Sequence, residues 1–237
     1  MNLRRGAGPP LVIGHRGAAA VAPENTLAAL EAAVAAGADL VEFDIGPDLQ
    51  LAHSLREVPV ESISLDGALD FLRSHGIGVQ LDLKLPGYEA AVIEHVRRHE
   101  LVGRAVVSTA WAASARTLAR IAPDIPCAIG YPRDRYGISR APWPAGLTRT
   151  GAAALRVAMP ARIPFLVRRA RATVLSLHQT LCSRAAVSAA HRAGVPVLAW
   201  TANDEATVVR LAAAGADAIV SDDPEMAVKA VATLTAP

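Results

Sequence analysis

Short apolar runs alternate with alanine-rich helical segments along most of the chain, and this alternation constrains the fold more than any other feature. The runs have the length of buried strands, and the segments between them repeat apolar residues at helical spacing. The expected strands are residues 11–14, 40–45, 78–84, 105–108, 127–131, 173–177, 196–200 and 218–220. The expected helices are residues 25–36, 65–74, 89–100, 113–122, 152–171, 184–192, 205–214 and 225–234, with Pro160 and Pro164 interrupting the fifth.

A strict order of strand and helix predicts parallel strands joined by right-handed crossovers. A doubly wound open sheet and a closed barrel share this order. Eight strand–helix units within 237 residues favour a (β/α)8 barrel, and we expect residues 1–237 to form one α/β domain. Two segments depart from the order. Residues 50–53 form a short extended return after the second strand, and residues 133–150 form the longest irregular stretch.

Composition excludes several classes of protein. Hydrophobic residues make up 52% of the chain, which argues against disorder, and a net charge of +2 does not suggest a nucleic-acid partner. The basic residues Arg168, Arg169 and Arg171 are interpreted as a solvated helix face rather than an anion-binding patch. Cys127 and Cys182 fit no zinc or CxxC pattern and are expected to be buried thiols. Without a signal-like or membrane-spanning apolar run, a cytoplasmic protein is expected.

Polar residues gather at the carboxyl ends of the expected strands, where a parallel barrel carries its chemistry. Glu42 and Asp44 are two apart and therefore share one face of their strand, as do Asp82 and Lys84. Carboxylates on a buried face need a partner, and three converging ones favour one hard divalent cation, Mg²⁺ or Ca²⁺. A structural network with Arg16 and Lys84 is the alternative interpretation.

Histidines near such a cluster are candidates for general acid and base, because imidazole titrates near working pH. His15 directly follows the first strand, and His53 ends the extended return. His178, after the sixth strand, is a further candidate for substrate or phosphate contact, with a structural histidine as the alternative. The histidines at 75, 95, 99 and 191 are expected on the surface, and Asp222 and Asp223 are interpreted as caps of the last helix.

Several motifs in order resemble the glycerophosphodiester phosphodiesterase family. They are His15-Arg16-Gly17, Pro23-Glu24-Asn25-Thr26, Gly37-Ala38-Asp39 leading to Glu42-Phe43-Asp44, the segment 197–203, and the closing segment 215–224. The matches span residues 11 to about 224, nearly the whole chain. Each motif alone is weak, but their order and spacing together are specific. The resemblance implies a TIM barrel with a bound divalent metal.

The resemblance also implies roles for individual residues. Glu42, Asp44 and Asp82 would bind the metal, and His15 and His53 would be the acid–base pair. Arg16 and Lys84 would hold the phosphate, Glu24 and Asn25 would support the site, and Trp200 would form an apolar wall for the alcohol.

The chain departs from the family pattern around the second histidine and the third carboxylate. The usual Thr-Lys-Asp-Gly is replaced by the link 46–50, and Ser54 stands where Asp usually follows the second histidine. Asp82 stands where the family usually has Glu. The small insertion that usually follows the second histidine is nearly absent, since only residues 55–64 precede the next helix.

The predicted reaction is metal-dependent hydrolysis of a glycerophosphodiester to an alcohol and glycerol 3-phosphate, with water or the substrate's own 2-hydroxyl as nucleophile. The substrate would be a small-molecule or lysolipid phosphodiester, and no oligomeric state is indicated. The shortened insertion motivates an alternative, an activity like lysophospholipase D or sphingomyelinase D on lipids. A non-enzyme alternative is a barrel that binds a phosphate ligand without turnover.

Overall fold

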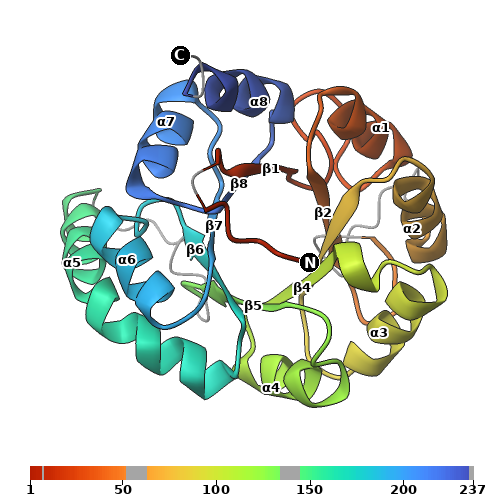
Figure 1. Cartoon of the computed structure of the whole chain (residues 1–237), viewed down its shortest axis with the longest axis horizontal. Helices are drawn as coiled ribbons and strands as arrows, with labels where there is room; N and C mark the ends of the chain where they lie inside the picture. Colours follow the sequence, from red (N-terminus) through yellow and green to blue (C-terminus); the bar gives the residue numbers. More distant parts are fainter. Residues whose placement is uncertain (7, 52–62, 134–144, 235–237) are drawn as a thin grey trace.

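The computed structural model describes residues 1–6, 8–51, 63–133 and 145–234, and of residues 145–150 only the backbone. The strands form a closed parallel barrel in the order β1 to β8, and helices surround it (Figure 1). The closed barrel confirms the expected fold class. Parallel strands buried on both faces are covered by the crossover helices that connect them.

The strands are short and lie close to the expected ranges. They are β1 Leu11–Gly14, β2 Leu40–Ile45, β3 Gly78–Leu83, β4 Ala105–Thr109, β5 Cys127–Tyr131, β6 Val174–His178, β7 Val197–Trp200 and β8 Ala218–Ser221. The helices are α1 Leu27–Ala35, α2 Leu65–Ser74, α3 Glu89–Arg98, α4 Ala112–Ile121, α5 Ala145–Ala170, α6 Arg184–Arg192, α7 Glu205–Ala214 and α8 Pro224–Thr233. A 3-10 turn, Val102–Arg104, precedes β4.

Side-chain caps explain where several helices begin. Ser64 accepts a hydrogen bond from the backbone N–H of Gly67 and caps α2, and Asp66 lies in the first turn of the helix. Helix α1 begins at Leu27 rather than at residue 25. Thr26 is its cap, and Asn25 has a φ of 60°, which is incompatible with a helix start.

The expectation that Pro160 and Pro164 interrupt the fifth helix was wrong, because α5 runs through both residues. Met159, Ile163 and Val167 recur every fourth residue and are buried, forming one apolar stripe along α5. Packing of this stripe holds the helix together despite the N–H groups that proline lacks. Helix α5 also includes residues 145–150, which the sequence had suggested were irregular; residues 134–144 lie outside the described part of the chain.

The inner face of the barrel changes from apolar to polar toward the carboxyl ends of its strands. In β2, Leu40, Glu42 and Asp44 alternate with outward residues and are all buried. The register sets Asp44 opposite Asp82 of β3, and Asp82 opposite Ser108 of β4. Three neighbouring strands therefore deliver polar side chains at one level of the barrel.

The other end of the barrel is closed by apolar residues. Leu3 is buried in a cluster with residues near the starts of the strands, among them Leu40, Val174 and Ala218. The N-terminal segment thus crosses the barrel near its centre in Figure 1. This leaves the carboxyl ends of the strands as the open, polar end. Both cysteines, Cys127 and Cys182, are free and buried as expected.

Part of the extended return is present. Leu51 pairs with Ile45 and Gln50 with Ser64 through isolated antiparallel bridges, whereas residues 52 and 53 lie outside the described residues. None of the helices in the described part of the chain has the length and apolar character needed to span a bilayer.

Candidate active site

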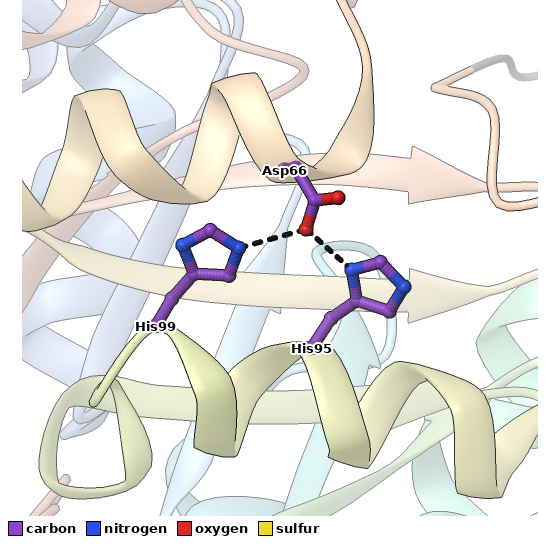
Figure 2. Close-up of side chains that lie close together, drawn as sticks. All are labelled: Asp66, His95 and His99. Atoms are coloured by element: carbon purple, nitrogen blue, oxygen red, sulfur yellow. Dashed lines mark hydrogen bonds and ion pairs between the residues drawn. The ribbon is translucent and has the colours of Figure 1, made fainter.

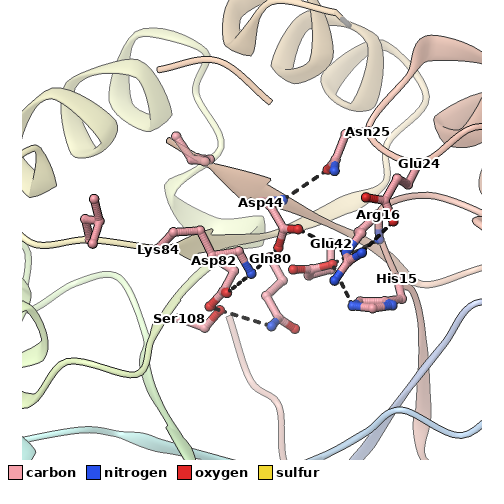
Figure 3. A network of polar contacts seen from close by, with 12 residues as sticks. His15, Arg16, Glu24, Asn25, Glu42, Asp44, Gln80, Asp82, Lys84 and Ser108 are labelled. Carbon is pink, nitrogen blue, oxygen red and sulfur yellow. Dashed lines mark hydrogen bonds and ion pairs between the residues drawn. The ribbon is translucent and has the colours of Figure 1, made fainter. Parts of the chain in front are cut away.

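The three carboxylates predicted to bind a metal meet at the open end of the barrel. Oxygen atoms of Glu42, Asp44 and Asp82 lie within 4.8 Å of one another. Glu42 is 4% exposed and Asp44 is fully buried. Ser108 donates a hydrogen bond of 2.7 Å to Oδ1 of Asp82 from the neighbouring strand. Figure 3 shows these side chains pointing toward one another.

Two cations contact this cluster, as the sequence suggested. Nε of Arg16 lies 3.0 Å from Oδ2 of Asp44, and its Nη1 donates to Oε2 of Glu24 at 2.5 Å. Nζ of Lys84 contacts Oδ1 of Asp44 and lies 2.7 Å from Oδ2 of Asp82. Asp44 therefore pairs with both cations, as the alternative to metal binding expected, whereas Glu42 accepts a hydrogen bond of 2.9 Å from the backbone N–H of Arg16. Charge balance distinguishes the two interpretations.

Among the described residues of this network, negative charge is in excess. Arg16 and Lys84 face the carboxylates of Glu24, Glu42, Asp44 and Asp82, so two negative charges have no permanent cation. Burial, with the charge of Asp44 next, raises the pKa of Glu42 from 4.5 to about 7. The excess charge and the all-oxygen donor set fit a hard divalent cation.

Lys84 is held in its charged form by the same excess. Burial lowers the pKa of Lys84, but the charges of Asp82, Asp44 and Glu42 outweigh it, so the pKa is raised well above its usual value. The ammonium group therefore stays positive throughout the working pH range. It also lines the cavity described below, where it is available to an anionic substrate group.

His15 is anchored by a carboxylate that the sequence analysis assigned to a helix cap. Nδ1 of His15 lies 2.5 Å from Oδ1 of Asp222, and its Nε2 lies 4.0 Å from Oε2 of Glu42. Asn203 in turn accepts from the backbone N–H of Asp222 at 3.0 Å. Burial lowers the pKa of His15, but the Asp222 hydrogen bond and the charge of Glu42 prevail and raise it.

Asp222 is thus a residue of the candidate site, and its interpretation as a cap was wrong. Asp223 alone performs the cap, accepting from the backbone N–H of Met226 at 2.9 Å. A signal was present in the expected fold. In a closed eight-stranded barrel the last strand pairs with the first, and here Ser221 is in register with Gly14. The residues that follow those two strands therefore meet.

The supporting and substrate-side residues occupy different positions around the cluster. Asn25 is buried, and its Oδ1 accepts from the backbone N–H of Asp44 at 3.2 Å. Trp200 lines the cavity, and its ring packs edge-on against His178 with centroids 5.0 Å apart. His178 thus lies behind Trp200, and its Nδ1 forms a hydrogen bond of 2.8 Å with Oγ1 of Thr180. Burial lowers the pKa of His178. His53, the other predicted catalytic residue, lies outside the described residues.

A cavity of about 440 Å³ opens over the cluster, a volume typical of small-ligand sites. Its lining combines His15, Arg16, Glu42, Asp82 and Lys84 with apolar groups such as Leu83, Val220 and Trp200. Arg133, which the sequence analysis did not single out, also lines it. Its guanidinium lies 4.0 Å from the ring centroid of Trp111, whose Nε1 donates to the carbonyl of Lys84 at 2.9 Å.

The turn that carries His15 and Arg16 depends on Gly17. This residue has a φ of +88°, and a Cβ there would lie 2.5 Å from the backbone of Ala29. Its N–H donates to the carbonyl of Glu42 at 3.2 Å, and the N–H of His15 donates to the carbonyl of Ser221 at 2.8 Å. The turn is therefore fixed between α1, β2 and β8.

Gly17→Ala is expected to lower the free energy of unfolding by roughly 1–3 kcal/mol more than Gly37→Ala, because overpacking adds to backbone strain. Gly37 is a matched control, since its φ is +81° and nothing lies within 4 Å of an added Cβ. Both variants incur the strain of a left-handed residue with a side chain. Urea unfolding curves measure the difference, and equal losses would contradict a close approach at Gly17.

The fold and the site define a class, that of (β/α)8-barrel enzymes whose chemistry lies at the carboxyl ends of the strands. The model of the glycerophosphoryl diester phosphodiesterase family matches residues 15–46 and 91–226, more than half of the chain. The chain belongs to this family and is a phosphoric diester hydrolase. Residues 47–90, which include the departures around the second histidine and Asp82, fall outside the match.

Relatives cover nearly the whole chain. A Bacillus subtilis protein provisionally named a glycerophosphodiester phosphodiesterase is 24% identical, over 92% of this chain and 96% of its own. The glycerophosphodiester phosphodiesterase of Caldanaerobacter subterraneus subsp. tengcongensis is 25% identical, over 93% and 97%. The structure of an Oleispira antarctica phosphodiesterase in complex with the product sn-glycerol-3-phosphate superposes with a TM-score of 0.71, at 23% identity and covering 94% and 97% of the two chains.

Proposed function

We propose that the protein hydrolyses a glycerophosphodiester to an alcohol and glycerol 3-phosphate, with one divalent cation, Mg²⁺ or Ca²⁺, and two histidines. The observation that carries the proposal is the convergence of Glu42, Asp44 and Asp82 beside His15, at a cavity that His15, Glu42 and Asp82 line. Family membership and the product held by the Oleispira antarctica enzyme support it.

Glu42, Asp44 and Asp82 would hold the cation, which supplies Lewis-acid stabilisation of charge on a phosphoryl oxygen. The remaining roles belong to side chains of this chain. Arg16 and Lys84 line the cavity as permanent cations and would bind and orient the phosphate oxygens. Trp200 and Val220 offer an apolar wall to the carbon chain of the alcohol or the glycerol.

His15 would move a proton at its Nε2, because Nδ1 is held by Asp222. A carboxylate on one ring nitrogen fixes the tautomer and stabilises the imidazolium that forms when the ring accepts a proton. His53 would be the opposite member of the acid–base pair, protonating the leaving alcohol or activating the nucleophile, a role that rests on the family pattern alone.

The test is release of the head-group alcohol from glycerophosphocholine, glycerophosphoethanolamine and a lysophospholipid. The second product is glycerol 3-phosphate from the first two substrates and an acylated glycerol 3-phosphate from the lysophospholipid. We expect release in Mg²⁺ or Ca²⁺, loss to background after EDTA treatment, and recovery when the metal is returned. Turnover of the lysophospholipid alone would favour the activity like lysophospholipase D. Absence of release from every substrate, or release that EDTA leaves unchanged, would contradict the proposal.

A further inference from the structure

A second cluster of metal-binding side chains lies between α2 and α3, on residues that the proposed reaction does not use. His95 and His99 are four residues apart, so their rings project from the same face at the end of α3. Both point toward Asp66 of α2, as Figure 2 shows. Nδ1 of His95 lies 2.6 Å and Nε2 of His99 2.7 Å from the same oxygen, Oδ1 of Asp66.

The sequence predicts both histidines on the surface, and for His99 this prediction was wrong. Its side chain is only 9% exposed, whereas the side chain of His95 is 17% exposed and that of Asp66 50%. The cluster is therefore a partly buried site with one open side. A buried imidazole with both nitrogens directed at carboxylates is a positioned group rather than a loose surface side chain.

The ligand atoms of the three side chains lie within 4.8 Å of one another. A tetrahedral zinc ion with bonds of about 2.0–2.2 Å holds its ligands roughly 3.4 Å apart, so side-chain shifts below about 1 Å would admit it. Two imidazoles and one carboxylate suit zinc and related transition metals, in contrast to the all-oxygen cluster at the barrel mouth. The exposed side leaves room for water as a fourth ligand.

Asp70 supplies an independent indication of a ligand site. Its Oδ1 lies 2.9 Å from Nδ1 of His99, the nitrogen that does not face Asp66. A carboxylate on the outer nitrogen fixes the tautomer of a metal-bound histidine and increases its basicity. Asp70 therefore contacts one nitrogen of His99, and the other nitrogen faces the position between the three ligand atoms. A metal ion at that position would complete a carboxylate–histidine–metal arrangement.

Arg98 is the competitor for this position. Its Nη2 lies 2.6 Å from Oδ1 of Asp66 and 2.7 Å from Nδ1 of His95. The side chain of Arg98 is half exposed, at 50%, so it can turn into solvent when a divalent ion replaces its charge. The guanidinium therefore occupies the position that a bound cation would take.

We propose that Asp66, His95 and His99, with Asp70 behind His99, form a second metal site for a transition-metal ion such as Zn²⁺, one that links α2 to α3. It is separate from the carboxylate cluster of the proposed reaction and does not depend on that function. A bound ion would stabilise the folded chain by favouring the native state over the unfolded one.

The experiment is calorimetric titration of Zn²⁺ into the untagged chain in excess Mg²⁺, which fills the catalytic cluster. We expect one saturable site. His95→Ala should weaken it by at least about 10–100-fold and Asp70→Ala by a comparable factor, the range found when a supporting group of a metal ligand is lost. His75→Ala, which removes an exposed imidazole at the end of α2, is the matched control and should bind Zn²⁺ like the parent.

Two further variants keep the outcome decisive. Arg98→Ala should bind Zn²⁺ at least as tightly as the parent, because the competing charge is gone. Glu42→Gln should also retain the site, because that carboxylate belongs to the catalytic cluster. No saturable binding by the parent, binding that survives His95→Ala unchanged, or loss of binding in Glu42→Gln would each overturn the proposal.

Discussion

Replacement of His15 by alanine is expected to lower kcat for glycerophosphodiester hydrolysis by a factor of about 10²–10⁴, the usual contribution of a positioned acid–base group. The reason is geometric. Nδ1 of His15 is held at 2.5 Å by Asp222, so its other nitrogen is presented to the cavity over the carboxylates. The contacts that we propose Arg16 and Lys84 make with the phosphate would remain in the variant, so KM should change much less than kcat.

Asp222→Asn tests whether that orientation matters. An amide in place of the carboxylate no longer stabilises the imidazolium, and we expect kcat to fall by about 10–100-fold with little change in KM. Because Asp222 raises the pKa of His15, the limb of the pH–rate profile that belongs to His15 should also move to lower pH. A merely structural role for Asp222 would leave that limb in place.

Asp223→Asn is the matched control, because Asp223 is the next residue and caps α8 through its Oδ1. Asparagine is an equally good cap, so both activity and stability should be retained. Thermal unfolding and circular dichroism of all three variants check that the barrel is intact. A loss of kcat below tenfold in a folded His15→Ala protein would remove His15 from the acid–base role.

The fold followed from the sequence because each strand–helix unit carries its own local signals. Helices α2, α6 and α7 begin and end where their caps and apolar spacing indicate, and β2 and β5 match their expected ranges. Prolines misled the prediction for α5, since local propensity is weaker there than burial of one apolar stripe. Propensity is read one residue at a time, whereas the stripe gains its stability only from packing against neighbouring helices.

The candidate site was predictable where its residues are two apart on one strand, and harder to predict where barrel closure joins distant strands. Glu42 with Asp44, and Asp82 with Lys84, are paired by strand alternation alone. Asp222 meets His15 only because β8 pairs with β1. Its own neighbourhood in the sequence, two aspartates before a proline, is equally typical of a helix cap. The pairing of β8 with β1 was therefore the information needed to place Asp222 in the site.

Glu42→Gln is expected to abolish most of the activity and, in EDTA, to make the protein more stable than the parent. Glu42 is buried beside Asp44, and its pKa is raised to about 7. The folded chain therefore disfavours the ionised carboxylate, and an isosteric neutral amide removes that cost. A pKa that moves from 4.5 to about 7 corresponds to roughly 3 kcal/mol, which is roughly 6–12 °C in Tm for a chain of this size.

The pH dependence follows from the direction of this shift. A carboxylic acid whose pKa is higher in the folded state takes up its proton first in the folded state as pH falls. In the parent, the loss of folding stability caused by ionising Glu42 is therefore absent below about pH 4.5. This loss grows as pH rises toward about 7 and is complete above that pH. The stability difference between Glu42→Gln and the parent, both in EDTA, should grow over the same interval.

Glu89→Gln is the matched control, because Glu89 is also buried but bonds the backbone N–H of Gly87 at 3.0 Å, away from the carboxylate cluster. It should show no gain in stability. Mg²⁺ should raise the Tm of the parent and of Glu89→Gln through preferential binding to the folded state, and leave the Tm of Glu42→Gln nearly unchanged.

The activity of Glu42→Gln should fall by at least about 10²-fold, since metal-assisted charge stabilisation contributes several kcal/mol. If Glu42→Gln proved no more stable than the parent in EDTA, the cluster would be a balanced ion-pair network. The excess of carboxylates over cations would then have no energetic consequence and would not indicate a divalent cation.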